Sequence, residues 1–569
     1  MLLLLLAVAG SGCALRMAQL VGTGDSRELR ERPEGAPRSS PDRPGILLLA
    51  LDGVDRSLLY DVLRRGETPG LARLLGGERG FPHAYFDDRY LSTLPSSTMV
   101  GWVTALTGVP PARHGIVGNE FFIRERRQLA APVPVTIDDT TPVLACYTDD
   151  YVDRLSLAPS VYERMREDDP AVLVWVAMQQ FHAGADRLLL TDRAVVAKAF
   201  QAFMEDEADR HLEGKKSRAV YEKLDDEIVD VVTERLAHGP VPDVLTVYLS
   251  GTDSYAHIAD EGPDAARVTY LREVLDPLFT RLADRLEERG ALANRFVVVT
   301  SDHGHTEVLH DDRHSLATTG PDEPPALLEK AGFRVRPFEL DVSDTADFDV
   351  VLAYQGAMAF VYVADRSTCS APGTPCDWTR PPRFREDVLA LADTIYRNDR
   401  TGAAVPALEG TIDMVLARRP VPYAADDLPF EVYVGNGRLE PVATYLRRHP
   451  HPAYVDLDAR LRDLAVGPHG ERAGDVLLIA HNGDRKRAED RYYFASRYRS
   501  WHGSPSATDS RIPLIVAHPR RSTAEIRTLV AGALGARPYQ QKLTDVLLAL
   551  RRTSGSPPLA STATIHAQP

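Results

Sequence analysis

Uninterrupted aliphatic runs recur along this chain, and helical patterns separate several of them. The runs cover residues 46–51, 172–176, 244–249, 296–300, 476–480 and 512–516. Such runs are typical of strands that are buried on both faces of a sheet. Apolar residues at helical spacing predict helices over residues 218–236, 267–286, 385–396 and 543–551. Strands that alternate with helices predict an α/β fold with a doubly wound, mostly parallel sheet.

The chain of 569 residues is long enough for one large domain with insertions. We expect a targeting segment at 1–19, a polar linker at 20–43 and a catalytic domain at 44–552, followed by a disordered tail at 553–569. Polar tracts predict insertions over about 120–240 and 320–470, which would form a cap above the sheet.

Composition excludes several classes of protein. Hydrophobic residues make up 44% and charged residues 26% of the chain, which argues against collagen, coiled coil and wholesale disorder. The net charge of -15 argues against a protein that coats nucleic acid, because phosphate backbones require many Lys and Arg. A small phosphorylated substrate remains compatible, since bound metal ions can reverse the local field.

The N-terminus predicts export from the cytoplasm. Residues 2–9 form an apolar run that is too short to span a bilayer and resembles the core of a signal peptide. Cys13 follows small residues, as at a bacterial lipoprotein cleavage site. Two interpretations stay open: Cys13 is lipidated and anchors the protein to the envelope, or it is discarded with the signal peptide. Either one predicts a periplasmic or envelope location.

The other cysteines fit an exported protein. Cys369 and Cys376 flank a short loop that contains Pro and Gly, and they can close a disulfide in an oxidising compartment. Cys146 then has no partner and is expected to be a small buried hydrophobic residue.

Acidic residues and histidines gather where the predicted strands end. In open α/β sheets, ligands bind beyond the carboxyl ends of the strands. Side chains four residues apart on a helical turn lie on the same face of the helix. The carboxylate of Asp253 and the imidazole of His257 can therefore bind one cation together. Carboxylate and imidazole ligands suit zinc, with manganese as an alternative. The candidates are Asp52, Asp253, His257, Asp302, His303 and His502.

These motifs, in this order, resemble the alkaline phosphatase superfamily and in particular its type I phosphodiesterase/nucleotide pyrophosphatase branch. The resemblance extends from about residue 46 to 516. It implies an alkaline-phosphatase-like fold and two divalent metal ions. One ion would be held by Asp253, His257 and His502, and the other by Asp52, Asp302 and His303.

The resemblance also implies a threonine nucleophile. Thr98 precedes the helical run 99–106 and lies nine residues before Thr107 of a Thr-Gly pair, which is the family's spacing. A helix start favours an anionic phosphoryl group, and a metal-bound threonine hydroxyl is readily deprotonated. Thr98 would therefore also contact a metal. Thr93 is the alternative nucleophile, because its Thr-Leu-Pro context looks similar. Asn119 is expected to donate a hydrogen bond to a phosphoryl oxygen, or else simply to form a turn.

The expected substrate class is inferred from one stretch of sequence that lacks Lys and Arg. Monoesterase relatives place Lys and Arg on a strand that corresponds here to residues 176–182, and neither residue occurs in that stretch. Because a monoester carries more negative charge than a diester, this favours phosphodiester or pyrophosphate cleavage. Phe181 would either line a substrate pocket or pack in the core.

Other functions stay open as alternatives to the phosphodiesterase. The alternatives are a phosphomonoesterase, a phosphotransferase that acts on lipid headgroups, and a catalytically inactive metal-binding lipoprotein. A sulfatase is disfavoured because no Cys/Ser-x-Pro-x-Arg element lies near Thr98.

His114 is expected to be structural. Three others are expected at the rim of the site, with the first of them nearest to it: His305, His310 and His314.

Overall fold

The structure is a computed structural model that describes residues 24–553 except 34, 78–79, 138, 140, 192–217, 318–319, 344, 372 and 421–426. The expected targeting segment with Cys13 and almost all of the expected C-terminal tail lie outside the described residues. In the described part of the chain, no helix combines the length and apolar character needed to cross a bilayer.

An eight-stranded sheet forms the centre of the molecule, and its five middle strands, β7-β6-β8-β2-β9, are parallel. β18 pairs antiparallel with both β9 and β3, and β1 pairs antiparallel with β7. The α/β class with a mostly parallel sheet is thereby confirmed. In spatial order the strands are β1 (Ser26–Glu28), β7 (Arg187–Leu189), β6 (Val174–Ala177), β8 (Val244–Leu249), β2 (Gly45–Leu51), β9 (Arg295–Ser301), β18 (Leu514–Ala517) and β3 (Ala84–Asp87).

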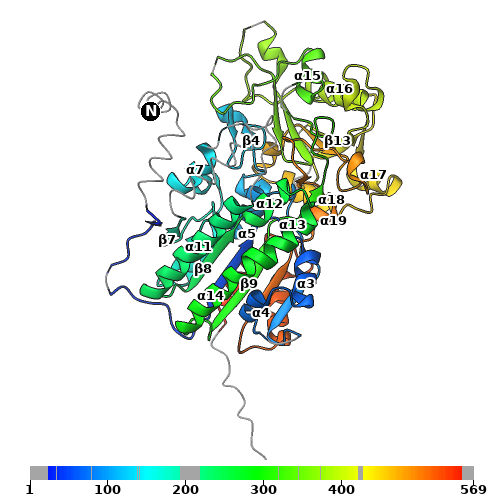
Figure 1. The fold of residues 1–569 in the computed structure, drawn as a ribbon. Helices are drawn as coiled ribbons and strands as arrows, with labels where there is room; N and C mark the ends of the chain where they lie inside the picture. The colour runs from blue at the N-terminus through cyan, green and yellow to red at the C-terminus, as the bar shows by residue number, and fades with distance from the viewer. Residues whose placement is uncertain are drawn as a thin grey trace, which may run out of the picture.

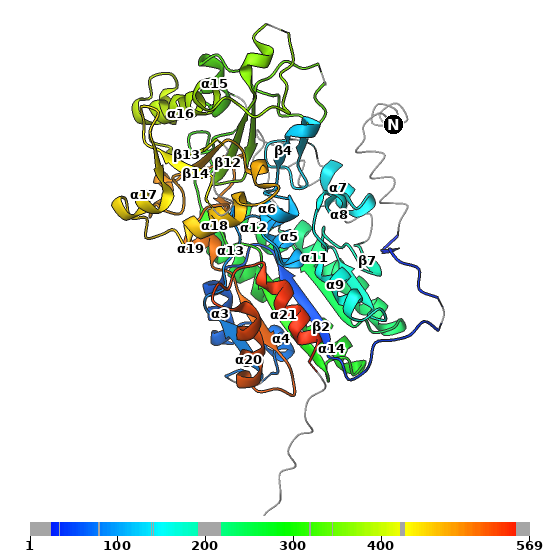
Figure 2. The ribbon, with the colours of Figure 1, turned by 180° about the vertical axis from the view of Figure 1, so that it is seen from behind.

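Helices cover both faces of this sheet, which explains the uninterrupted aliphatic runs. Every residue of β2, β8 and β9 is buried. Helices α11 and α14 cross the face seen in Figure 1, and α9, α20 and α21 cover the opposite face seen in Figure 2. The α-helices are α3 (Arg56–Arg65), α4 (Pro69–Leu74), α5 (Thr98–Thr107), α6 (Pro111–His114), α7 (Thr141–Thr148), α8 (Tyr151–Leu155), α9 (Val161–Asp168), α11 (Ala219–His238), α12 (Gly251–Ile258), α13 (Pro263–Tyr270), α14 (Asp276–Glu288), α15 (Pro324–Lys330), α16 (Ala390–Thr401), α17 (Val442–Arg448), α18 (Leu457–Ala465), α19 (Ala507–Ser510), α20 (Thr523–Leu534) and α21 (Lys542–Arg551).

A second, antiparallel sheet of six strands lies above the first (Figures 1 and 2). Its β16 is the aliphatic run 476–480, which therefore belongs to this sheet and not to the central one. An antiparallel strand that is buried on both faces has the same uninterrupted aliphatic sequence as a parallel one. The sequence run alone therefore does not distinguish the two types of strand. The strand order is β11 (Val350–Tyr354), β12 (Met358–Val363), β16 (Val476–Ala480), β13 (Ile412–Arg418), β14 (Phe430–Tyr433) and β15 (Leu439–Pro441). Two short ribbons pair β4 (Phe121–Ile123) with β5 (Gln128–Ala130), and β10 (Thr306–Glu307) with β17 (Ser500–Trp501).

Three segments differ from the sequence-based expectation. The region 20–43 contributes the edge strand β1, which pairs with β7 in spite of its polar sequence. The region of about 120–240, expected as an insertion, instead belongs in part to the central sheet and its cover: β6 and α11 match the strand and helix predicted at 172–176 and 218–236, and β7 is an additional strand. The helix expected over 267–286 is built from α13, a π-helical turn at Leu271–Leu275 and α14.

The cysteines follow the expected pattern. Cys369 and Cys376 form a disulfide across seven residues of sequence. Cys146 is free and fully buried. Burial raises the pKa of its thiol, so it stays in the neutral form.

Candidate metal centre

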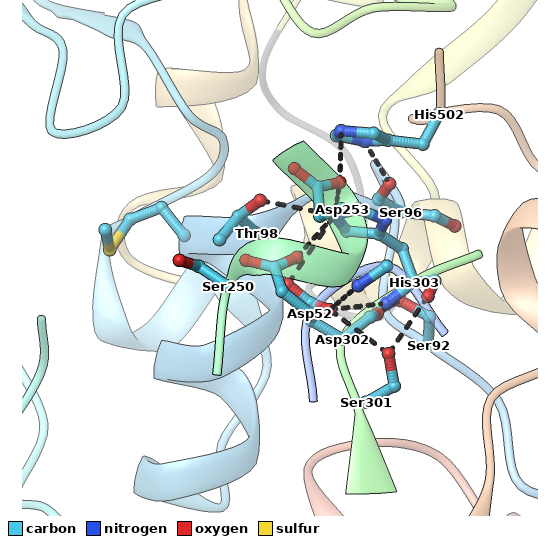
Figure 3. Close-up of polar contacts among 12 residues, drawn as sticks. Asp52, Ser92, Ser96, Thr98, Ser250, Asp253, Ser301, Asp302, His303 and His502 are labelled. Carbon is cyan, nitrogen blue, oxygen red and sulfur yellow. Dashed lines mark hydrogen bonds and ion pairs between the residues drawn. The ribbon is translucent and has the colours of Figure 1, made fainter. Parts of the chain in front are cut away.

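The strand ends bring the predicted acids and histidines to one place (Figure 3). Asp52 directly follows β2, and Asp302 with His303 follows β9. β8 leads into α12, which carries Asp253. His502 follows the short strand β17 and approaches from the opposite side of the site. Because β8, β2 and β9 are neighbouring parallel strands, their carboxyl ends share one edge of the sheet.

One group of ligand atoms is centred on Asp253. His257 Nε2 lies 3.5 Å from Asp253 Oδ2, and His502 Nε2 lies 3.9 Å from Asp253 Oδ1. One ligand atom from each of the three residues lies within 4.8 Å of the other two. The helical turn of α12 places Asp253 and His257 on one face, as their spacing predicts.

A second group combines two carboxylates with one imidazole. His303 Nε2 lies 3.5 Å from Asp52 Oδ1 and 3.5 Å from Asp302 Oδ2. The same nitrogen lies 3.9 Å from Asp253 Oδ1, so the two groups adjoin. The rings of His303 and His502 are stacked, with centroids 3.6 Å apart. The six predicted ligands therefore converge in the fold.

The buried oxygens of this second group fit a bound cation. Asp52 Oδ1 and Asp302 Oδ2 are buried and have no hydrogen-bond partner. Burial and the neighbouring carboxylates of Asp302 and Asp253 raise the pKa of Asp52 well above its ordinary value, and burial likewise raises the pKa of Asp302. Buried carboxylates of this kind are normally paired or bound to metal. A divalent cation would satisfy both oxygens and offset the repulsion between them.

Backbone hydrogen bonds orient two imidazoles of the centre, and burial favours the neutral form of one of them, His502. Burial lowers the pKa of His502 well below its ordinary value, and the neighbouring His303 lowers it further. Its Nδ1 bonds to the backbone carbonyl of Ser96 at 3.1 Å, which leaves Nε2 toward Asp253. His257 uses Nδ1 in the same way, at 2.7 Å from the carbonyl of Ser500. Backbone bonds of this type fix the tautomer of metal-binding histidines.

His305 belongs to the centre more closely than the sequence indicates. Its Nε2 lies 2.7 Å from Asp253 Oδ1, and its Nδ1 lies 3.0 Å from Ser500 Oγ. With Asp253 and His303 it forms a third group of ligand atoms within 4.8 Å. Burial lowers its pKa to about 3. Its position two residues after His303, on the same loop, is the sequence signal that points to it.

Thr98 faces the metal groups, whereas Thr93 does not. Thr98 begins α5 and its Oγ1 lies 3.2 Å from His303 Nε2 (Figure 3). The backbone of Thr93 is held by Gln540 and by the buried Arg460. Thr98 lines the cavity described below and Thr93 is not among its lining residues. The geometry therefore places the hydroxyl of Thr98, rather than that of Thr93, beside the candidate ligands.

Asn119 lies at the same helix start. Its Oδ1 accepts the backbone N–H of Met99 at 2.9 Å, so a side chain from outside α5 caps the helix. Its own backbone N–H donates to Gln355 Oε1 at 2.8 Å. Because Oδ1 is engaged, the Nδ2 group is the donor available to a ligand at the cavity, which Asn119 also lines.

A cavity of about 260 Å³ opens beside Thr98. Its described lining includes Asp52, Asp253, His257 and His502. Most of the other lining residues are apolar or aromatic, and none of the described ones is Lys or Arg. Phe181 is buried in the core and does not line it, although Met178 and Gln180 from the same stretch do. The apolar and aromatic wall residues are Val133, Pro134, Val135, Ile137, Val143, Leu144, Tyr147, Met178, Tyr221, Leu224, Tyr248, Ile258, Tyr498 and Trp501.

Two buried residues outside the motifs support the centre. Asp225 accepts the backbone N–H groups of Ser250 at 3.2 Å and Gly251 at 3.1 Å, and thereby anchors the start of α12. Burial raises the pKa of Asp225 to about 7. The Tyr248 hydroxyl donates to Asp52 Oδ2. Both lie in elements that the sequence predicts, but no motif marks their contacts with the centre.

The remaining histidines lie outside these groups. His114 is fully buried, with Nε2 2.9 Å from Thr104 Oγ1, and burial lowers its pKa to about 3. His314 lies against Asp311 at 2.8 Å. Of the three expected rim histidines, only His305 is among the candidate ligand groups found in the described residues.

Solved structures and one protein-family model match this chain. Murine ectonucleotide pyrophosphatase/phosphodiesterase 5, in an inactive variant in complex with AMP, is 13% identical with a TM-score of 0.47, and the match covers 90% of this chain and 96% of that one. The human protein of the same name is also 13% identical, with a TM-score of 0.46, and the match covers 90% of this chain and 96% of that one. The model of the type I phosphodiesterase/nucleotide pyrophosphatase family matches residues 46–362, more than half of the chain. The protein therefore belongs to the type I phosphodiesterase/nucleotide pyrophosphatase family.

Proposed function

We propose that this protein is a metal-dependent hydrolase that cleaves phosphodiester or pyrophosphate bonds, with Thr98 as its nucleophile. The observation that carries the proposal is the position of Thr98 Oγ1, 3.2 Å from His303 Nε2 and beside two adjoining groups of ligand atoms. A residue that only capped α5 would need no such surroundings. Family membership supports a hydrolase of this class.

Two divalent ions, which we propose to be zinc, would be held by the two groups of the centre. When bound, such ions lower the pKa of a coordinated hydroxyl and stabilise negative charge on the reacting oxygens. Imidazole nitrogen and carboxylate oxygen donors together suit zinc, and they also accept manganese. The ligands would be Asp253, His257 and His502 for one ion, and Asp52, Asp302 and His303 for the other, with Thr98 beside them.

The chain's own groups would carry out two successive displacements at phosphorus. Thr98 Oγ1 forms a bond to phosphorus while the bond to the leaving oxygen breaks, and the hydroxyl proton passes to solvent. The phosphoryl group on Thr98 then lies at the start of α5, where backbone N–H groups favour negative charge. Asn119 Nδ2 donates to a nonbridging oxygen. Water finally releases the phosphoryl group and restores the hydroxyl of Thr98.

The cavity wall supports a diester over a monoester. A monoester phosphoryl group carries more charge and benefits from cationic side chains at its nonbridging oxygens. The described lining of the cavity contains no Lys or Arg. Its apolar side, which includes Leu144, Tyr221 and Ile258, instead suits the second substituent of a diester or pyrophosphate.

Hydrolysis assays on wild type and two threonine variants test this proposal. We expect bis-p-nitrophenyl phosphate to be cleaved faster than p-nitrophenyl phosphate, and EDTA to abolish activity that zinc restores. Thr98→Ala should lower kcat/KM on the order of 10³-fold or more. Thr93→Ala is the matched control and should retain activity. A strong preference for the monoester, or full activity in Thr98→Ala, would refute the corresponding part of the proposal.

We further propose that the protein works outside the cytoplasm. The Cys369–Cys376 disulfide supports this, because such bonds persist in oxidising compartments. The apolar run at residues 2–9 supports it independently. Fractionation of a bacterial host tests the location, and comparison with Cys13→Ser separates lipid anchoring from simple secretion. Recovery of the wild type in the cytoplasm would contradict export.

A further inference from the structure

A second cluster of acids and histidines lies at the edge of the six-stranded sheet, apart from the metal centre. Asp413 lies near the start of β13, and His481 directly follows the end of the neighbouring β16. Asp484 lies three residues beyond, and His451 comes from the segment after α17. None of these residues lines the cavity at Thr98. We call the set the peripheral cluster: Asp413, His451, His481 and Asp484.

The ligand atoms of the peripheral cluster lie close enough to share one ion. Asp413, His481 and Asp484 each contribute an atom within 4.8 Å of the other two. His481 Nδ1 lies 2.8 Å from Asp484 Oδ2 and 3.6 Å from Asp413 Oδ1. His451 Nε2 lies 3.0 Å from the same Asp413 oxygen and supplies a fourth donor. Imidazole nitrogens and carboxylate oxygens are donor types that zinc accepts.

Surrounding hydrogen bonds orient these donors as they would around a metal. His451 Nδ1 donates to the backbone carbonyl of His449 at 2.7 Å and Nε2 donates to Asp413 Oδ1 at 3.0 Å. A cation at this position would take the place of the Nε2 proton, while the carbonyl of His449 would keep the proton on Nδ1. The second oxygen of Asp413 accepts the hydroxyl of Tyr454 at 2.7 Å. Backbone and phenol partners of this type commonly support metal ligands from the outside.

Burial and charge strengthen the case for a cation. The side chains of Asp413, His451, His481 and Asp484 are 7%, 14%, 15% and 11% exposed, so two carboxylates are withdrawn from water together. The Arg485 guanidinium lies against them, 3.2 Å from Asp484 and 3.1 Å from His481 Nδ1. Arg485 is itself 44% exposed and can turn into solvent. If Arg485 turned away and a cation replaced the Nε2 proton of His451, a divalent ion would balance the charge of the two carboxylates.

We propose that the peripheral cluster binds one divalent cation of the zinc class, and that the Arg485 guanidinium competes with this cation for the carboxylates. The ion would join β13, β16 and the segment that carries His451. That segment pairs with the chain around Pro505: Val455 N–H donates to its carbonyl at 3.0 Å, and Ala507 N–H donates to Ala453 at 2.8 Å.

The position of this ion gives it a structural role. Pro505 lies three residues after His502, a candidate ligand of the metal centre, so a link through the cluster would hold the loop of His502 against the upper sheet. The role is independent of the proposed chemistry at Thr98, because the cluster does not line the cavity beside that threonine.

Metal analysis of the purified full-length chain tests the proposal. After EDTA treatment, reloading with zinc and gel filtration, we expect His481→Ala and Asp413→Asn each to contain one zinc fewer per chain than wild type. His449→Ala is the matched control, because this neighbouring exposed histidine contributes only its carbonyl, and it should retain the full number. Asp302→Asn should lose metal from the other centre, so the effects of His481→Ala and Asp302→Asn should add.

Arg485 provides a second variant, which we expect to fold because its side chain is already 44% exposed. Arg485→Met should tighten zinc binding by roughly 10-fold, because the competing cation is removed, and should enlarge the rise in melting temperature that zinc produces. That rise should be smaller in His481→Ala than in His449→Ala. Equal zinc content in wild type, His481→Ala and Asp413→Asn would overturn the proposal, and so would an Arg485→Met protein with unchanged zinc affinity.

Discussion

Two clusters of the molecule contain the same residue types but differ in how their charges are balanced. The metal centre and a cluster of Asp150, Asp153 and His182 both place carboxylates and imidazole within 4.8 Å. In the metal centre, Asp52 Oδ1 and Asp302 Oδ2 are buried without a hydrogen-bond partner and lie 3.5 Å from His303 Nε2. In the other cluster, which we call the His182 cluster, Asp150 lies 2.9 Å from Arg27 and 3.2 Å from His182.

We propose that this difference distinguishes a cluster that binds metal from one that does not. Close spacing of acids and histidines is common to both. In the metal centre, two buried carboxylate oxygens that face His303 have no hydrogen-bond partner. In the His182 cluster, by contrast, Asp153 Oδ1 accepts the backbone N–H of His182 at 2.9 Å. The carboxylate oxygens of the peripheral cluster have hydrogen-bond partners in the structure, so a cation there would have to displace some of them together with Arg485.

The largest effect is expected when one carboxylate charge is removed from each cluster in turn. Asp302→Asn keeps the size of the side chain but weakens a ligand, so we expect metal loss and a fall in kcat/KM of more than about 100-fold, the upper range seen for residues that only support metal ligands. Asp153→Asn should leave both zinc content and kcat/KM near wild type. Metal analysis and diesterase assays on the two variants measure this.

The comparison between the two clusters would fail if Asp153→Asn lost as much metal as Asp302→Asn. It would also fail if Asp302→Asn retained all its zinc, because the unpartnered oxygen would then have no role in binding. Circular dichroism of both proteins serves as the control for folding.

The variant Asn119→Asp tests whether Asn119 binds the phosphoryl group of the substrate. Its expected effect on kcat/KM is similar to that of Asp302→Asn or smaller. Asn119→Asp keeps an oxygen to accept the N–H of Met99 but removes the Nδ2 donor and adds a negative charge. We expect kcat/KM to fall on the order of 100-fold, with the melting temperature little changed. A large loss of stability with unchanged kcat/KM would instead show that Asn119 serves only as a helix cap.

Much of the metal centre follows from local sequence, for a physical reason. Aliphatic runs buried on both faces mark parallel strands, and parallel strands deliver the residues that follow them to one edge. Asp52, Asp253 and Asp302 can therefore be grouped from the sequence alone. Thr98 follows from the family spacing to the Thr-Gly pair, together with its position at a helix start.

Other features depend on contacts between distant segments, which no local pattern encodes. Gln355 binds the backbone of Asn119 across 236 residues of sequence, and Asp225 anchors α12 from the preceding helix. The antiparallel position of β16 depends on its pairing with β12 and β13, because its own sequence suits either type of sheet. The same holds for β1, whose polar residues are tolerated because it lies at an edge of the sheet.

The smallest effect on activity is expected from His182, which should instead affect stability. His182 is fully buried and its Nε2 lies 3.2 Å from Asp150 and 3.6 Å from Asp153. His182→Gln removes the positive partner of these carboxylates, so we expect the free energy of unfolding to fall by about 1–3 kcal/mol. Zinc content and kcat/KM should stay close to wild type. Urea unfolding followed by circular dichroism measures the loss.

The pH dependence of that loss shows whether charge or packing is responsible. Burial alone would lower the pKa of His182, but the hydrogen bond to Asp150 and the charges of Asp153 and Asp150 raise it above its ordinary value. A raised folded-state pKa stabilises the protein below the unfolded value of about 6.5 and loses this effect as pH rises through the folded value. The stability difference between wild type and His182→Gln should therefore be larger at about pH 5.5 than at about pH 9. A difference that is constant across this range would mean that His182 acts by packing, and that its cluster is not balanced by charge.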